Sequence, residues 1–486
     1  MPENRTTGVT RSDLLAGMPA AVPVGAAEVR QARGADPRRL VVLDDDPTGT
    51  QSVADLPVLT GWSEDDLAWA LGTGAPAVYV MTNSRSLDPD TAERRNRDVV
   101  ETAVRAAERC HVEIDVVSRS DSTLRGHFPL ETDAIAATLA AADDRTVDGV
   151  ILAPAFADAG RLTVRSVHYA GSDADGFVPV GRTEFARDAT FGYTSSDLRA
   201  WVAEKTDGRV PPEEVVPLTL DRLRAGPGSV AEVLNSLRDA RPVAVDIAEE
   251  NDLRLLALGI LRAEADGRRF VHRVGPPFVR ALIGQDVADP LTPADVAALH
   301  AGAGREDLAP HGLVVVGSHV ALTTRQLDTL RERRRPTEIE IDVARVLGQA
   351  RDAHLEDVMT RTVEGLRAGT VVLSTSRTLV TGQSGDDSLD IARRVSDAVV
   401  SLVRRVIDRR PPRFVVAKGG ITSSDVAAHG LEISRAFVRG PMLPGIVSLW
   451  EPVGGPAHGI PYVVFAGNVG DEHSLADVVD KLTARG

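Results

Sequence analysis

The segment of residues 40–51, which reads LVVLDDDPTGTQ, contains the pattern from which the fold can be predicted. Its aliphatic run suits a buried β-strand, and a cluster of carboxylates, hydroxyl residues and a turn glycine follows at once. Similar aliphatic runs recur along the chain, each followed by a polar or glycine-rich turn and then by a stretch of helical periodicity. This alternation is typical of α/β proteins. We therefore predict two α/β domains, each a mainly parallel sheet flanked by helices.

The recurring runs place the expected elements and the domain boundaries. We expect strands at residues 40–43, 77–81, 114–117, 149–152, 243–247, 313–316, 371–373, 414–417 and 462–465. We expect helices at residues 89–109, 129–142, 252–265, 323–333, 387–409 and 423–429. Residues 286–311 show no clean period and are interpreted as a connection. The predicted organisation is an N-terminal arm over residues 1–38, a first domain over 39–300 and a second over 312–486; the arm is expected to be flexible or peripheral.

Composition excludes several classes of protein. The chain has 486 residues, of which 43% are hydrophobic and 26% charged, as in globular proteins. The formal charge of −15 argues against a general nucleic-acid-binding surface, and no apolar run approaches the ~20 residues of a membrane span. The single cysteine, Cys110, excludes a disulfide framework and fits a reducing compartment. We expect a cytoplasmic protein that binds neither nucleic acid nor membranes.

Polar loops follow three strands of the predicted first domain. The loops are residues 44–51 (DDDPTGTQ), 82–86 (TNSRS) and 118–127 (SRSDSTLRGH). Ligands of open α/β sheets bind where strands end, so these loops are candidates for one site. Guanidinium groups bind carboxylates in a bidentate way, and small hydroxyl residues suit sugar hydroxyls. The loops together favour a pocket for a polyhydroxy acid; residues 153–161 (APAFADAGR) form either another wall or an ordinary turn.

Glycines follow three strands of the predicted second domain. They lie in residues 317–318 (GS), 419–424 (GGITSS) and 467–471 (GNVGD). Glycine lets the backbone approach a phosphate, and a following helix N-terminus offers free N–H groups. These turns favour a nucleotide cradle, although the chain contains no P-loop motif and no metal-binding histidine spacing. No metal ligand can be named from the sequence.

Taken in order, these motifs resemble the four-carbon acid sugar kinase family over about residues 39 to 475. They are Asp45-Asp46-Pro47-Thr48-Gly49, Thr82-Asn83-Ser84-Arg85, Asp121-Ser122-Thr123-Leu124-Arg125-Gly126, Gly317-Ser318, Gly419-Gly420-Ile421-Thr422-Ser423, Pro444-Gly445 and Gly467-Asn468-Val469-Gly470. The resemblance implies a sugar-acid-binding N-terminal domain, an ATP-binding C-terminal domain and phosphorylation of the terminal hydroxyl of a tetronate or 3-oxo-tetronate. ATP and Mg²⁺ are the implied cofactors, and a homodimer is left open.

The resemblance also assigns residues to the two ligands. On the substrate side it places Asp45, Arg85, Asp121, Ser122, Thr123 and Arg125. On the ATP side it places Ser318, Gly420, Ile421, Thr422, Ser423 and Gly467. The loop carboxylates are the cluster best suited to accept the hydroxyl proton, so we expect Asp45 or Asp46 to be the catalytic base. We also expect Arg85 and Arg125 to bind the substrate carboxylate, and the domains to close around Mg²⁺-bound phosphates.

The chain departs from the family pattern at three motifs. The family commonly has D-D-F-T-G-A where residues 45–50 read DDPTGT, an asparagine at the position of His127, and K-S-G-N-F-G where residues 465–470 read FAGNVG. The last change removes a lysine from the ATP side. Lys418, beside the Gly419 turn, either replaces that lysine or is a solvated lysine at a strand end. These departures affect the substrate identity and the details of ATP binding.

Two other functions fit parts of the sequence. Asp44-x-Asp46 after a strand also matches the nucleophile loop of aspartate-dependent phosphatases, with Asp44 phosphorylated and Asp46 as acid/base. That chemistry needs a later lysine, for which the first domain offers only Lys205, and it leaves the glycine turns unexplained. A non-catalytic sugar-acid sensor would leave the nucleotide domain unexplained. Detecting ADP release in the presence of a sugar acid separates the three functions.

Overall fold

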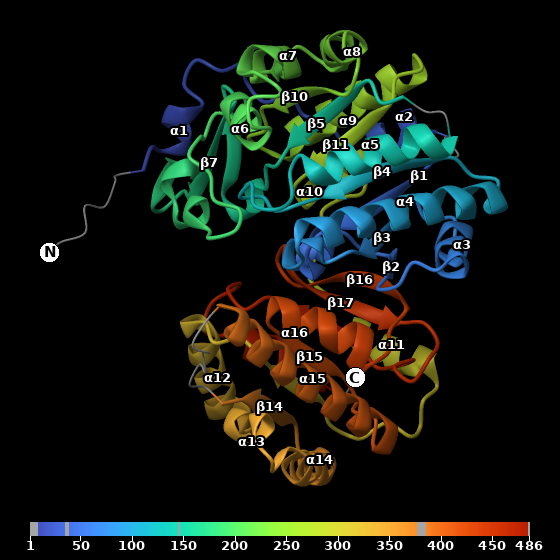
Figure 1. Cartoon of the computed structure of the whole chain (residues 1–486), viewed down its shortest axis with the longest axis vertical. Coiled ribbons are helices and arrows are strands. Elements are labelled where there is room, and N and C mark those ends of the chain that lie inside the picture. Colours follow the sequence, from blue (N-terminus) through green and yellow to red (C-terminus); the bar gives the residue numbers. More distant parts are fainter. Residues whose placement is uncertain (1–7, 35–37, 144–145, 377–384, 485–486) are drawn as a thin grey trace, which may run out of the picture. The chain divides into compact units, whose positions relative to one another are not determined.

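The computed structural model describes residues 8–34, 38–143, 146–376 and 385–484. The chain divides into two units by its internal contacts. Unit 1 consists of Met1–Gly49 and Trp62–Val287, and unit 2 of Thr50–Gly61 and Ala288–Gly486. Each unit is an α/β structure with strands that are mainly parallel and helices that flank them, as the sequence predicts (Figure 1). The fold class is therefore confirmed.

The sheet of unit 1 is parallel along its length. Its strand order is β3-β1-β4-β11-β5-β10-β9, and each neighbouring pair is parallel. The strands are β1 (Arg39–Asp44), β3 (Ala77–Met81), β4 (Ile114–Arg119), β5 (Gly149–Ala153), β9 (Val216–Leu218), β10 (Arg241–Val245) and β11 (Phe270–Val274). The chain goes from β1 to β3 on one side and later to β4 on the other. The carboxyl end of β1 is thus the switch point at which ligands bind in such sheets.

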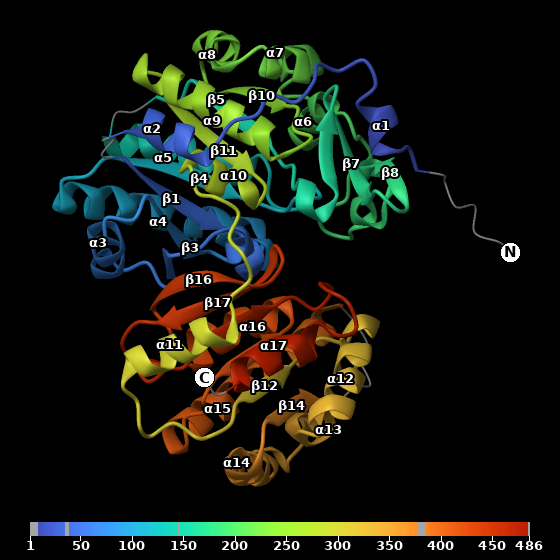
Figure 2. The same cartoon turned by 180° about the vertical axis from the view of Figure 1, so that it is seen from behind.

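Helices cover both faces of this sheet. In Figure 1, α4 (Pro89–Cys110) and α5 (Leu130–Asp143) lie in front of it, with α3 (Glu64–Gly72) packed on α4. Figure 2 shows α9 (Glu250–Ala265) on the other face with α2 (Ala26–Arg33) and α10 (Pro277–Leu282); α7 (Leu220–Arg224) and α8 (Pro227–Asn235) also pack on α9. Local sequence starts these helices where they are seen: Asp88 caps α4 and Pro89 occupies its first turn.

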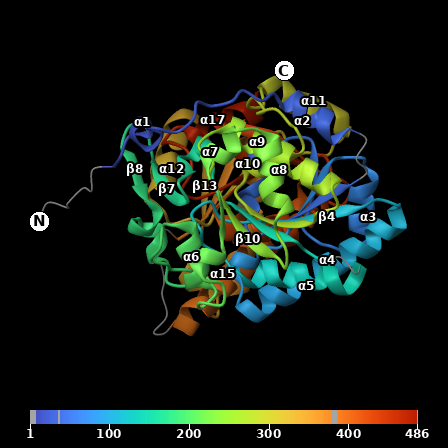
Figure 3. The same cartoon turned by 90° about the horizontal axis from the view of Figure 1, so that it is seen from above.

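A small antiparallel sheet and the N-terminal segment complete unit 1. The sheet consists of β6 (Arg161–Val164), β7 (Val167–Ser172) and β8 (Gly176–Pro179), followed by α6 (Leu198–Lys205). Figure 3 shows α1 (Arg11–Leu14) beside β8, where Val9 pairs with Phe177. Leu14 and Val29 are buried, and Arg224 donates to the Pro19 carbonyl at 2.6 Å. Residues 8–34 are therefore packed onto unit 1 as a peripheral segment, which was one of the two expectations for the arm.

The sheet of unit 2 is parallel at one end and antiparallel at the other. Its order is β13-β14-β12-β15-β18-β17-β16-β2, with the first five strands parallel and the last three joined antiparallel. The strands are β2 (Leu56–Leu59), β12 (Leu313–Val316), β13 (Thr337–Ile341), β14 (Val371–Thr375), β15 (Val415–Lys418), β16 (Arg435–Leu443), β17 (Ile446–Pro452) and β18 (Tyr462–Phe465). Its core joins strand residues to α17 (Ser474–Thr483).

Helices lie on both faces of this sheet as well. Figure 2 shows α11 (Pro293–Ala303), α12 (Ala321–Arg334) and α17 on one face. Figure 1 shows α15 (Gly385–Arg409) and α16 (Gly420–Asp425) on the other, with α13 (Val343–Leu347) and α14 (Arg351–Ala368) packed on α15. A π-helical turn over Val426–Gly430 follows α16, so the expected helix at 423–429 is in fact divided between two helix types.

The two units differ from the predicted domain division in two places. Residues 50–61 belong to unit 2, because β2 pairs with β16 and Thr50 bonds to Ser448 and Trp450. The expected connection at 286–311 contains α11, and unit 2 begins at Ala288. The first difference arises from pairings between residues far apart in the sequence, which local periodicity does not report. The second does not, since α11 has local start signals in Pro293 and the capping box of Thr292 and Asp295.

Candidate functional site

The carboxyl ends of β3, β1 and β4 bring the three polar loops of unit 1 together. Arg85, in a 3-10 turn after β3, donates to both carboxylate oxygens of Asp45, with Nη2–Oδ1 at 2.6 Å and Nε–Oδ2 at 3.0 Å. Its Nη1 lies 3.4 Å from Asp46 Oδ2. Arg119, the last residue of β4, binds Asp44 and lies 3.3 Å from Asp45. Adjacent acids can coexist on this loop because guanidinium groups bind them.

The two candidate bases have different surroundings. Asp45 is buried, and burial raises its pKa to about 7 despite the opposing effect of Arg85. The Asp46 side chain is 23% exposed and accepts hydrogen bonds from the backbone N–H and hydroxyl of Thr48. A carboxyl group with a pKa near 7 suits general base catalysis at neutral pH, whereas Asp46 is more accessible to a ligand. Both remain candidates for the base.

The loop of residues 121–126 lies next to this pair. Arg125 Nε donates to Asp121 Oδ2 at 2.8 Å, and Thr123 also donates to this carboxylate. Burial alone would raise the pKa of Asp121, but the nearby Arg85 and Arg125 together with these hydrogen bonds hold it well below its usual range. Arg85 and Arg125 therefore flank Asp121, and each is bound to a carboxylate of the protein. The predicted loops thus meet in one charged cluster.

Three residues of this cluster were not singled out from the sequence. Arg119 neutralises Asp44, and Glu131 of α5 accepts a hydrogen bond from Ser84. Arg273, near the end of β11, donates to Ser120 Oγ and, at 3.3 Å, to the Arg125 carbonyl. Its strand reads FVHRV, whose polar residues hide a buried strand from pattern analysis. The sequence did contain one indication of Arg273 as a site residue. It stands one residue before the end of β11, just as Arg119 ends β4 and Arg85 follows β3.

Residues 153–161, for which a wall or a simple turn was left open, place Arg161 at the same site. The guanidinium carbons of Arg161 and Arg125 each lie 5.5 Å from the centre of the Phe185 ring. Burial lowers the pKa of Arg161, with Asp121 and Arg125 acting on it in opposite directions. Residue 161 therefore contributes a further cation beside Asp121.

In unit 2 the glycine turns meet at the carboxyl ends of β12, β15 and β18, which are neighbouring strands. A β-carbon at Gly317 would overlap Thr422 Oγ1, and one at Gly467 would overlap Ser318 Oγ. Gly419 has φ +130°, and its β-carbon would lie 3.1 Å from Thr422 Oγ1. The predicted ATP-side residues are thus brought to one edge, and close packing explains the glycines.

Two predicted ATP-side residues have structural roles in the turn. Gly420 begins α16, and the left-handed backbone conformation belongs to Gly419 instead. Ser423 is buried, and its hydroxyl donates to the carbonyls of Ala417 and Gly419. Ser423 therefore stabilises the turn from within. For Ile421 the structure describes the helical backbone only.

Lys418 is buried beneath these turns. Its Nζ donates to the Ala466 carbonyl at 2.7 Å, lies 3.5 Å from the Gly467 carbonyl and sits 3.9 Å from the centre of the Phe465 ring. Burial lowers its pKa to about 7. Lys418 is therefore not the solvated strand-end lysine that was one of the two alternatives; in this conformation it holds the 466–467 turn.

The phosphatase alternative fits the structure poorly. Asp44, its proposed nucleophile, is fully buried and bound by Arg119. Lys205, its proposed phosphate ligand, donates to the carbonyls of Phe191 and Gly192. A nucleophile must reach the phosphorus atom, and Asp44 is covered. The described residues also contain no group of three or more His, Cys, Asp or Glu side chains placed to hold a metal ion.

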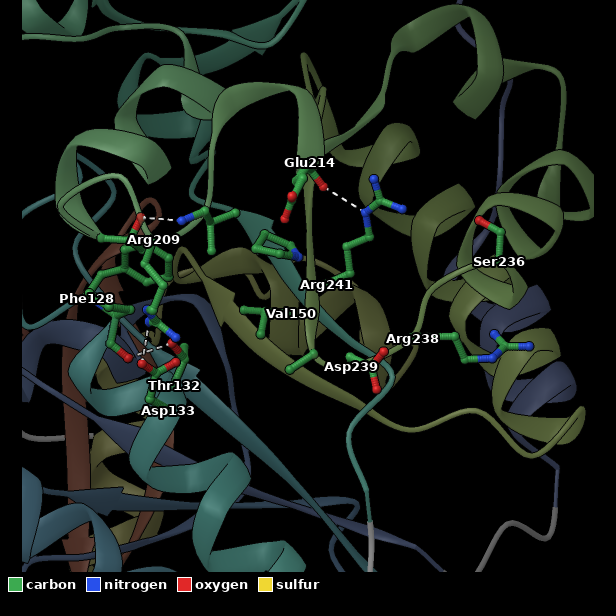
Figure 4. A pocket seen from close by; sticks show the side chains of 15 residues that line it. Phe128, Thr132, Asp133, Val150, Arg209, Glu214, Ser236, Arg238, Asp239 and Arg241 are labelled. Atoms are coloured by element: carbon green, nitrogen blue, oxygen red, sulfur yellow. Dashed lines mark hydrogen bonds and ion pairs between the residues drawn. The ribbon is translucent and has the colours of Figure 1, made fainter.

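A pocket of about 510 Å³ lies elsewhere in unit 1 (Figure 4). Arg209 and Asp133, which form an ion pair at 2.5 Å, lie on one of its sides. On another side Arg241 donates to the Glu214 carbonyl at 2.8 Å. None of the predicted site residues lines it, although Phe128, which immediately follows the 118–127 loop, does. The pocket is therefore separate from the charged cluster.

Comparisons with known proteins agree with this division of the chain. A model described as a sugar-binding N-terminal domain matches residues 40–282, and one described as a nucleotide-binding C-terminal domain matches residues 313–475. No curated protein matches the chain significantly. Among the described residues, no helix is long and apolar enough to cross a membrane.

Two solved structures share the fold over most of both chains. A Salmonella typhimurium LT2 protein provisionally named a tRNA synthase is 18% identical, with a TM-score of 0.64, covering 91% of this chain and 98% of that one. A Haemophilus influenzae protein of a domain family of unknown function is 17% identical, with a TM-score of 0.62, covering 90% and 98%. At these identities the likeness shows the fold alone.

Proposed function

The chain belongs to the four-carbon acid sugar kinase family, and we propose that it is an ATP-dependent kinase that phosphorylates the terminal hydroxyl of a four-carbon acid sugar. The acceptor is a tetronate or a 3-oxo-tetronate, and the enzyme is a phosphotransferase with an alcohol group as acceptor. The observation that carries the proposal is the charged cluster at the switch point of unit 1. Its carboxylates, arginines and hydroxyl groups match both ends of a hydroxy acid.

The residues of this cluster take distinct roles in the proposed reaction. Asp45 or Asp46 accepts the proton of the attacking hydroxyl, and Arg85 fixes Asp45 by its two parallel hydrogen bonds. Asp121, Ser122, Thr123 and Arg125 bind the rest of the substrate. Phosphoryl transfer depends chiefly on positioning and charge neutralisation, so a site fixed in advance by ion pairs suits it.

The glycine turns of unit 2 are proposed to hold ATP. Backbone at Gly419 and Gly467, together with Ser318 and Thr422, would lie against the phosphates, and α16 begins directly after the turn. Lys418 would support this cradle through the carbonyls of the 466–467 turn. Mg²⁺ usually takes most of its ligands from phosphates and water, and we assign it no ligand in this chain. A cytoplasmic location is part of the proposal, whereas a homodimer remains an expectation.

The test is an assay of ADP release with a panel of four-carbon aldonates and oxo-aldonates. At least one acid should stimulate ADP release, whereas the neutral tetroses should not, because they lack the carboxylate that Arg125 is proposed to bind. Stimulation by a neutral tetrose to the same extent would contradict the arginine-based recognition. Absence of stimulation by every acid would contradict the proposed function.

A further inference from the structure

The loop of residues 121–126 has an unusual division of its backbone hydrogen bonds. Its carbonyl groups are held by donors of the protein: that of Asp121 by the Leu124 N–H and that of Gly126 by the Phe128 N–H. Three more are held by buried side chains from three other segments. These are the carbonyls of Ser122, Thr123 and Arg125, bound by His168, Tyr193 and Arg273 at 2.8, 2.6 and 3.3 Å respectively.

Most N–H groups of the same loop, in contrast to its carbonyl groups, have no hydrogen-bond partner in the described part of the chain. Within the described part of the chain, those of Ser122, Thr123, Arg125 and Gly126 have no acceptor. In a trans peptide the C=O of one residue and the N–H of the next point in opposite directions. Because His168 holds the Ser122 carbonyl, the Thr123 N–H points away from His168. The Gly126 N–H points away from Arg273 for the same reason.

The backbone of the loop is strained in a way that suits such an arrangement. Leu124 is a buried non-glycine residue with φ +68°, and Gly126 has φ +115°. Left-handed residues alternating with ordinary ones turn successive N–H groups to one side, which forms an anion-binding concavity. Conformations of this kind persist where the surroundings hold them, and they cluster at binding sites. The three buried donors supply that support.

We propose that the free N–H groups of residues 122–126, above all those of Thr123 and Gly126, bind the substrate carboxylate. His168 and Arg273 are positioning residues that hold these two donors toward it, and Tyr193 is a positioning residue that fixes the Thr123–Leu124 peptide between them. This inference rests on the proposed function, since it assigns the ligand of the same site. It adds a backbone anion site to the recognition by arginine side chains that the sequence predicts.

Each positioning residue is fixed by its own contacts. His168 is fully buried; a carbonyl only accepts, so Nε2 carries the proton and Nδ1 accepts from Thr163 at 2.9 Å. Burial lowers the pKa of His168 to about 4, which keeps this neutral form. Arg273 lies over the rings of Phe128 and Trp201, at 5.4 and 5.3 Å from their centres. These contacts leave the donors little freedom to move away from the loop.

The test compares Tyr193→Phe with Tyr79→Phe. Tyr193→Phe removes the donor to the Thr123 carbonyl, whereas Tyr79→Phe removes a buried hydroxyl of unit 1 that has no hydrogen-bond partner among the described residues. Calorimetry would measure the binding of a four-carbon aldonate and of its neutral amide to the wild type and both variants. ADP release would be followed in parallel with the same aldonate.

The wild type should prefer the acid, and Tyr193→Phe should reduce the acid-over-amide preference by about tenfold, a typical effect of one lost buried hydrogen bond. Amide and ATP binding should be unchanged in both variants, and Tyr79→Phe should keep the full preference. An unchanged preference in Tyr193→Phe, or equal losses for acid and amide, would overturn the inference. Acid binding without ADP release would overturn only the proposed function, and no acid binding by the wild type would overturn both.

Discussion

The two candidate ligand sites are built from different parts of the chain. In unit 1 the site consists of side chains whose charges are matched, as in the bidentate pair of Arg85 with Asp45. In unit 2 it consists of backbone turns, and its buried cation, Lys418, is bound by carbonyl groups. Side chains distinguish one small acid from another, whereas backbone N–H groups suit the phosphates of ATP, which is the same co-substrate for every acceptor acid. Variants at the two sites should therefore have separable effects.

The largest effect is expected from the loop carboxylates. Asp45→Asn or Asp46→Asn should lower kcat by roughly 10²–10⁴-fold, whichever residue is the base, because the amide cannot accept the hydroxyl proton. The KM for ATP should change little in both variants. Steady-state kinetics would be compared with Asp90→Asn, which alters an exposed acid in the first turn of α4. Full turnover in both loop variants would remove the assignment.

A smaller effect is expected from Arg85→Lys. An ammonium group cannot reproduce two parallel hydrogen bonds to Asp45, so kcat/KM for the sugar acid should fall roughly 10- to 100-fold while ATP binding is retained. The matched control is Arg97→Lys, since Arg97 forms an exposed pair with Glu93 on α4. Equal kinetics in the two variants would show that the bidentate geometry is unimportant.

The pH dependence distinguishes Asp45 from Asp46. Burial raises the pKa of Asp45 to about 7, so its basic form is lost as the pH falls below that value. If Asp45 is the base, kcat/KM should fall about tenfold per pH unit below pH 7 and level off above it. A profile that is flat between pH 5.5 and pH 8 would exclude Asp45 as the base.

The smallest effect is expected in the nucleotide cradle. Gly419→Ala places a β-carbon at φ +130°, close to Thr422, and about 1 kcal/mol of distortion should weaken ATP binding about fivefold. Sugar-acid binding should be unchanged. Gly72→Ala is the control, since a β-carbon there meets no atom within 4 Å. Calorimetry with both ligands would measure the effects; equal loss of both would contradict the separation of the sites.

The sequence predicted the features that are local. The strand of residues 40–43 and its acidic loop could be recognised because the aliphatic run and the turn chemistry are contiguous. The same holds for α4, whose cap, proline and period all agree. The three glycine turns of the second domain could also be recognised, because each directly follows an aliphatic run. Within the middle turn, however, Gly419 rather than Gly420 has the left-handed conformation.

Features that depend on distant pairings could not be predicted. β11 contains the buried polar residues His272 and Arg273, so its sequence does not look like a core strand, and the burial of Arg273 is compensated by Ser120 and the Arg125 carbonyl in another segment. Likewise β2 joins unit 2 through pairing with β16, which lies far along the chain. The anchoring of the 121–126 loop by His168 and Tyr193 has no sequence signature at all. Each depends on the fold that brings the partners together.

The proposed reaction transfers the γ-phosphate of ATP to a four-carbon acid sugar. Its most direct test is to incubate the wild type with ATP, Mg²⁺ and the aldonate that stimulates ADP release, and to follow phosphorus by nuclear magnetic resonance. We expect loss of the γ-phosphate signal with the appearance, in equal amount, of a phosphate ester on the terminal carbon of the acid. Release of inorganic phosphate without an ester, or an ester on a neutral tetrose to the same extent, would contradict it.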